Sequence, residues 1–68
     1  MGGELTGVIK FFNSGKGYGF ITPDRGGEDV LVEVGELRMP RSPNEGERVI
    51  YRVESSEQGY RALEVRGV

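Results

Sequence analysis

The sequence predicts an all-β protein in which five short strands close, fully or in part, into a small barrel. The 68-residue chain shows no helical hydrophobic stripe of useful length. It consists instead of short β-rich runs separated by turn residues, a pattern typical of small sandwiches and barrels. Five such strands bury one modest core, and closing them into a barrel removes the exposed sheet edges.

The first two strands are expected at the start of the chain. One covers residues 4–13 (ELTGVIKFFN), and a tight SGK connection leads to the next over residues 17–22. Pro23 suits the end of that second strand, because proline cannot donate to the hydrogen-bond ladder. Residues 24–29 (DRGGED) then read as a Gly-rich hairpin loop.

The third strand is expected over residues 30–34 (VLVEV). Alternation with period two predicts that its three valines lie on one face and that Leu31 and Glu33 lie on the other. A polar connection with two prolines follows. It is expected to hold a helical turn around residues 36–39.

The last two strands are expected over residues 48–54 and 60–67, on either side of an SSEQG turn. The chain shows no internal repeat and no second domain, so residues 1–68 are expected to form a single domain. The core residues expected from these runs are Ile21, Val30, Val32, Ile50 and Val53.

The composition argues against several functional classes. The chain has no Cys, so disulfides, thiolate nucleophiles and Cys-based metal sites are excluded. It has no His, the commonest general base and metal ligand. No apolar run approaches the ~20 residues of a membrane span. We therefore expect a soluble, cytoplasmic protein that is not an enzyme and has no cofactor, no metal, no small-molecule substrate and no membrane partner.

The charge balance bears on nucleic acid as a partner. Nine Lys and Arg stand against eleven Asp and Glu, a net charge of −2. Proteins that bind duplex DNA mainly through phosphate contacts usually carry a basic excess. Single strands remain compatible with an acidic chain, because base stacking can supply the affinity.

The stretch KGYGF carries the strongest functional signal. Tyr18 and Phe20 fall on the same face of the expected strand, since side chains alternate. Gly17 and Gly19 cost strand stability, which suggests a close approach by another strand or by a base lying flat. Lys16 is placed to meet a phosphate. Residue types alone leave two interpretations open, an exposed stacking face and ordinary core packing.

These residues belong to a longer resemblance. The stretch GVIKFFNSGKGYGFITPDRGGEDVLVEVGEL closely resembles the cold-shock domain, in which a motif K-G-(F/Y)-G-F-I is followed by a second motif D-V-F-V-H. The stretch EGERVIYRVESSEQGYRALEVRGV is similar to the family's closing pattern, more weakly. The resemblance implies a five-stranded OB-fold-type barrel that binds single-stranded RNA or DNA by base stacking.

The resemblance also implies which residues touch nucleic acid. Asp29 matches the acidic residue that opens the second motif, where it accepts hydrogen bonds from a base edge. Arg61 and Gln58, in the last hairpin, are possible minor contacts. The contacts implied by the first motif and the strand before it are Lys10, Phe11, Lys16, Tyr18 and Phe20.

The second motif departs from the family pattern. Leu31 stands in the place of its Phe and Glu33 in the place of its His, and Val34 stands where an aromatic is common. We therefore expect weaker single-strand binding, with Leu31 as a diminished contact. The alternative is a protein–protein or structural module in which Leu31 and Val34 form an apolar patch. Oligomeric state is not visible in the sequence, and a monomer is favoured.

The remaining polar residues are expected to be structural. Asp24, Glu28 and Asp29 cluster in one loop without the spacing of a calcium site, so we interpret them as solvated charges. Ser14 and Ser55 are expected in turns. SGKGYG lacks the glycine spacing and the Ser or Thr of a phosphate loop. A surface of ion pairs with interleaved carboxylates is expected for Arg38, Arg41, Arg48, Arg52, Arg61 and Arg66.

Overall fold

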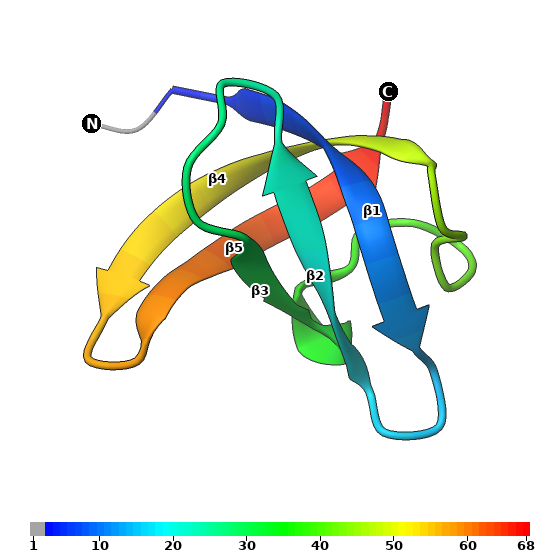
Figure 1. Ribbon diagram of the computed structural model, residues 1–68. Helices are drawn as coiled ribbons and strands as arrows, with labels where there is room; N and C mark the ends of the chain where they lie inside the picture. The colour runs from blue at the N-terminus through cyan, green and yellow to red at the C-terminus, as the bar shows by residue number, and fades with distance from the viewer. Residues whose placement is uncertain (1–2) are drawn as a thin grey trace.

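In the computed structural model, which describes residues 3–68, five strands close into one barrel in the order β1-β2-β3-β5-β4. All neighbouring strands are antiparallel except β3 and β5. Figure 1 shows β1, β2 and β3 crossing the front and the long β4–β5 hairpin crossing behind them. The elements are β1 (Leu5–Asn13), β2 (Tyr18–Pro23), β3 (Val30–Glu33), a 3-10 turn η1 (Val34–Glu36), β4 (Arg48–Ser56) and β5 (Gly59–Gly67).

The core fills the barrel and draws on every strand. Aliphatic side chains and one tyrosine are almost completely buried, and Leu5, Phe12, Leu37 and Val53 pack against them. The core residues are Ile9, Ile21, Val30, Val32, Val49, Tyr51, Ala62 and Val65. Because this set closes the interior without Phe11, Tyr18 or Phe20, those rings are not needed to fill it.

The predicted fold class is confirmed, with differences at the element ends. The helical turn expected around residues 36–39 is wrong in place, since η1 covers Val34–Glu36. Val34 therefore leaves the strand and is 55% exposed, instead of sharing the buried face of Val30 and Val32. Ser55 lies inside β4 and not in a turn, because the hairpin turns at residues 57–58.

The expected core was wrong at Ile50. Along β4, Val49 and Tyr51 are buried and Val53 packs against them, so Ile50 lies on the opposite, outer face. Ile50 and Val53 are an odd number of residues apart and cannot share a face of a regular strand. Tyr51, which the sequence analysis did not place in the core, takes the interior position.

Carboxylates pair with five of the six arginines that were expected in ion pairs. The expectation is wrong at Arg38, which donates instead to the backbone carbonyls of Gly35 and Leu37. Arg48 pairs with Asp24 at 2.7 Å, and Arg41 pairs with Glu47 at 3.0 Å. The hydrogen bond from Arg48, helped by one from Thr6, lowers the pKa of Asp24. These pairs are exposed, so each contributes little to stability on its own.

Candidate nucleic-acid interface

Three aromatic rings meet on the outer face of β1 and β2. Phe11 lies directly opposite Phe20, and Tyr18 lies two residues before Phe20 on β2. Their ring centroids are 6.1 Å apart for Phe11 and Tyr18, 5.7 Å for Phe11 and Phe20, and 6.1 Å for Tyr18 and Phe20. We call these three residues the aromatic cluster. Each is half-buried, so the edges and faces not used by a neighbour remain open to solvent.

A β-bulge in β1 puts Phe11 in this cluster. Ile9 pairs with Ile21, but the next pair is Phe11 with Phe20, which leaves Lys10 as the extra residue. Unbroken alternation from the buried Ile9 would turn Phe11 inward and Phe12 outward. The bulge reverses this, so Phe12 packs against the core and Phe11 faces out.

The structure requires glycine at Gly17 and at Gly19 for two different reasons. A side chain on Gly19 would collide with β1, since its Cβ would lie 2.7 Å from the Cα of Phe12. The close approach suggested by the sequence is therefore that of a strand. Gly17 has a φ of 82°, which favours glycine, and its carbonyl accepts a 2.8 Å hydrogen bond from the Val34 amide.

The outer face continues from the rings across β3 to β5. Leu31 pairs with Phe20, and Arg61 pairs with Leu31, so a row of side chains runs Phe11, Phe20, Leu31, Arg61. We call this set the outer row. Residues directly opposite each other on neighbouring strands have Cβ atoms about 4.5–5.5 Å apart. A ligand lying along the row would thus meet two rings, one aliphatic side chain and one guanidinium.

Carboxylates already hold two of the three predicted cationic contacts. Arg61 donates to Glu33 at 3.3 Å and to Glu54 at 2.6 Å, and its hydrogen bond to Glu54 is the main cause that raises the pKa of Arg61. Lys10 pairs with Asp29 at 2.9 Å. Within residues 3–68, Lys16 forms no ion pair with a carboxylate.

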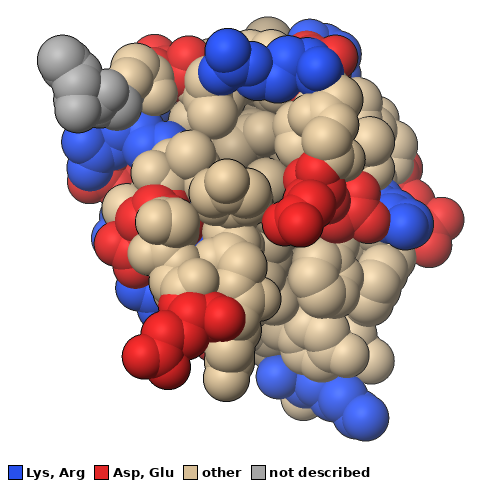
Figure 2. Space-filling view, turned by 60° about the vertical axis from the view of Figure 1, so that its left-hand side comes forward, with Lys and Arg blue, Asp and Glu red and all other residues tan. Residues whose placement is uncertain are grey.

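The face of the molecule drawn in Figure 2 carries no large area of one charge. Basic and acidic groups there form small patches among neutral atoms, some of them in contact with a patch of the opposite charge. A phosphate chain would therefore meet local cations among carboxylates, with little long-range attraction.

Comparisons with known proteins identify the family of the chain. The model of the 'Cold-shock' DNA-binding domain family matches residues 5–68. The chain belongs to the cold-shock domain family. It is 39% identical to the cold shock-like protein CspG of Escherichia coli over 96% of both chains. It is 42% identical to the cold shock-like protein CspA of Stigmatella aurantiaca, over 93% of this chain and 96% of that protein.

Two further matches are to chains longer than this one. The glycine-rich protein 2 of Nicotiana sylvestris is 45% identical, over 97% of this chain and 32% of its own length. A solved structure titled drosophila Unr CSD456 superposes with a TM-score of 0.81, covering 97% of this chain and 27% of that one. Its identity is 16%, so it supports the fold alone.

In this cold-shock domain some of the predicted site residues lie together and others lie apart. The aromatic cluster and Leu31 lie together, and Arg61 closes the outer row. Lys10 and Asp29 lie together as an ion pair at the bulge. Lys16 lies in the turn between β1 and β2, and Gln58 lies in the turn between β4 and β5.

Sequence reasoning missed Glu54. It lies across from Arg61 in the β4–β5 hairpin and accepts that side chain's shorter hydrogen bond. The signal was present in the turn, because pairing outward from residues 57–58 brings Glu54 opposite Arg61. The other carboxylate that pairs with Arg61, Glu33, is 28 residues away in sequence and contacts it only when the barrel closes.

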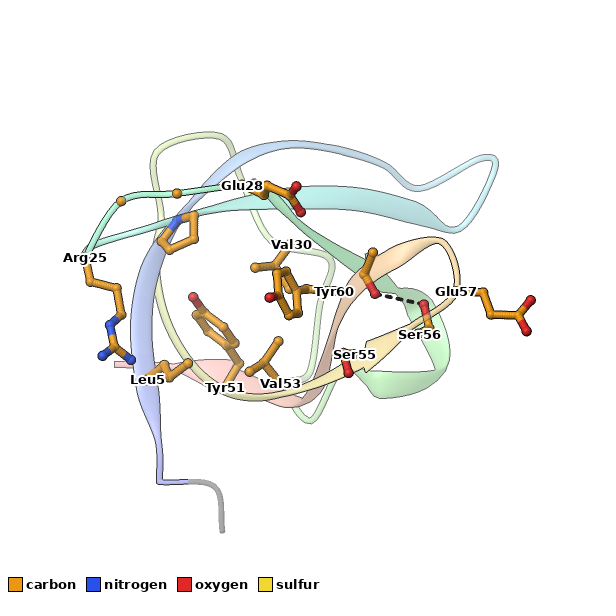
Figure 3. A pocket seen from close by; sticks show the side chains of 14 residues that line it. Leu5, Arg25, Glu28, Val30, Tyr51, Val53, Ser55, Ser56, Glu57 and Tyr60 are labelled. Carbon is orange, nitrogen blue, oxygen red and sulfur yellow. Dashed lines mark hydrogen bonds between the residues drawn. The ribbon is translucent and has the colours of Figure 1, made fainter.

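The described residues also line an open groove of about 810 Å³ at one end of the barrel. Figure 3 shows Tyr51, Val53 and Tyr60 pointing into it, with Arg25 and Glu28 at its rim. The Tyr51 hydroxyl is buried without a hydrogen-bond partner among the described residues, and burial raises its pKa. The groove shares no lining residue with the aromatic cluster.

Two other findings concern the described residues only. No helix there is long and apolar enough to cross a membrane. No group of three or more carboxylates there is arranged to hold a metal ion.

Proposed function

We propose that this cold-shock domain binds single-stranded RNA or DNA by stacking bases on the aromatic cluster. One observation carries the proposal: three rings contact one another on the outer face, while a complete core lies behind them. Half-buried rings that the core does not need keep apolar area in contact with water, and a base can cover that area. Single strands suit such a surface, because their bases are free to leave one another and stack on side chains.

The binding is weaker than an all-aromatic surface of the same shape would give. Each base–aromatic stack is worth ~1–3 kcal/mol, so the absence of rings at Leu31 and Glu33 costs roughly 2–6 kcal/mol if the positions act independently. At 1.4 kcal/mol per factor of ten, the affinity falls about 30-fold to 10⁴-fold. Glu33 adds repulsion toward a polyanion, and its ion pair with Arg61 keeps that cation from phosphate.

The other site residues have supporting roles in this proposal. Lys16 contacts a phosphate beside the first stacked base, and Lys10 does so if it leaves Asp29. Asp29 accepts a hydrogen bond from a base edge. The domain acts without catalysis or cofactor, as a cytoplasmic monomer that traps strands when they open and so keeps RNA unpaired.

Fluorescence anisotropy with a labelled heptanucleotide that contains all four bases tests the proposal. At low salt the unmodified protein binds, and Tyr18→Ala and Phe20→Ala each weaken binding by ~1–3 kcal/mol. Tyr60→Ala is the matched control, because Tyr60 is 48% exposed but lies in the groove, away from the cluster. Nanomolar affinity would contradict the weak binding, and unchanged affinity in both cluster variants would refute the stacking role.

A second candidate function rests on exposed apolar surface. Val34 is 55% exposed and Leu31 is half-buried, and a protein partner would use these two side chains as apolar contacts. If the barrel serves only such contacts, the heptanucleotide does not bind even at low salt. The same titration therefore separates the two candidates.

A further inference from the structure

Glu33 is the polar group placed best to read a base on the aromatic cluster. It pairs directly with Tyr18 across β2 and β3, so both side chains rise from the same outer face. Opposing Cβ atoms at such a pair are about 4.5–5.5 Å apart. A base stacked on Tyr18 therefore has one edge toward the Glu33 carboxylate, which is 50% exposed.

The carboxylate is held in place with acceptor capacity left over. Its Oε1 accepts a 3.3 Å hydrogen bond from Arg61, while Oε2 accepts none from any described residue. Arg61 is itself anchored by the 2.6 Å hydrogen bond to Glu54. The side chain thus presents an ionised oxygen whose lone pairs are available to a ligand on the outer face.

Base edges differ in what they offer a carboxylate. Cytosine and adenine carry an exocyclic amino group, and guanine carries the N2 amino group beside the N1–H, two donors that match two carboxylate oxygens. Uracil and thymine present carbonyl oxygens on both sides of a single N3–H. These oxygens face the carboxylate as acceptor against acceptor, which is repulsive.

We propose that Glu33 selects amino-bearing bases, guanine above all, over uracil and thymine at the Tyr18 position. This inference rests on the proposed function, because it needs a base stacked on the cluster. Arg61 acts as a positioning residue that restrains the carboxylate from the β5 side, opposite the β2 strand that carries Tyr18. Glu33, which stands where the family pattern has His, would thus lose stacking area and gain recognition of the base edge.

The test compares four labelled single strands of sequence TTXTXTT, where X is T, C, A or G. The isolated X positions keep the guanine probe from pairing with itself. We expect the guanine probe to bind at least about fivefold more tightly than the thymine probe, with cytosine and adenine between them. In Glu33→Gln the amide both accepts and donates, so the ratio of guanine to thymine affinity falls toward one and the thymine probe binds more tightly.

Glu4→Gln is the matched control. It removes the same charge from a carboxylate that also pairs with an arginine, because Glu4 accepts a 2.6 Å hydrogen bond from Arg66, but it lies outside the outer row and does not contact Arg61. It shifts the affinity of all four probes together and leaves their ratios unchanged. Thymine binding as tightly as guanine, or a ratio unchanged in Glu33→Gln, overturns the inference alone. Failure of every probe to bind at low salt overturns the proposed function, and the inference with it.

Discussion

Replacing Leu31 by Phe tests the stacking account most directly. Leu31 lies between Phe20 and Arg61 in the outer row, so a ring there would extend the aromatic cluster by one strand. The position is on the outside and half-buried, and a larger side chain can project into solvent without entering the core. The change therefore alters the proposed binding surface while leaving the barrel interior intact.

The expected gain follows from what leucine already provides. A full base–aromatic stack is worth ~1–3 kcal/mol relative to alanine, and leucine retains part of the apolar contact. We therefore expect Leu31→Phe to gain about 1–2 kcal/mol, which is roughly a fivefold to thirtyfold lower Kd. Anisotropy titration with the mixed-sequence heptanucleotide at constant salt measures this change.

Leu63→Phe is the matched control for the same chemical change. Leu63 is half-buried on β5, where it pairs with Arg52, outside the outer row. A ring added there should leave the Kd within about twofold, since it meets no base stacked on the cluster. If Leu31→Phe binds no better than the unmodified protein, or if both variants gain equally, stacking along the outer row is the wrong account.

Three further predictions follow from charge and burial. Lys10 and Arg61 are held in ion pairs, so Lys16 is expected to make the one phosphate contact. The logarithm of the observed binding constant should then fall with the logarithm of the salt concentration with a slope of about −0.7. A slope near −2 would mean that Lys10 and Arg61 also contact phosphates. The hydrogen bond from Arg48 is the main cause that lowers the pKa of Asp24. Ionised Asp24 therefore stabilises the fold at pH values above the ordinary carboxyl pKa, and this contribution is lost as the pH falls through the lowered pKa. Tm should therefore hold from pH 7 to about 5 and drop below about pH 4, and Asp24→Asn should flatten that drop. Tyr51→Phe removes a buried hydroxyl without a hydrogen-bond partner, so the free energy of unfolding in urea should stay unchanged or rise by up to about 1 kcal/mol. A decrease in the free energy of unfolding would mean that the hydroxyl stabilises the fold.

The sequence predicted what depends on local pattern. Alternation alone put Tyr18 and Phe20 on one face and Leu31 on the outer side of the third strand, and the structure has the same faces. The turn residues placed the loops within two or three residues. These features follow from strand geometry, which acts between neighbours along the chain.

Features that depend on pairing between strands were not predictable in the same way. The bulge at Lys10 that turns Phe11 outward is a property of the β1–β2 register, and nothing in the β1 residues alone specifies it. The resemblance to the cold-shock domain supplied that placement for Phe11. The choice of Tyr51 over Ile50 for the interior likewise follows from the register of β4 against β1 and β5.

The ion pairs around Arg61 connect affinity and selectivity in one arrangement. Two carboxylates pair with a guanidinium that could otherwise attract phosphate, and on the proposed function this would lower the affinity for every single strand. The same contact restrains Glu33, which pairs with Tyr18 across β2 and β3, and in the inference proposed above its carboxylate would distinguish base edges. A ring at position 33 would stack on any base, since every base has a flat face, whereas a carboxylate interacts with base edges of the right chemistry. On the proposed function and the inference drawn from it, the second motif of this chain would thus exchange affinity for base preference.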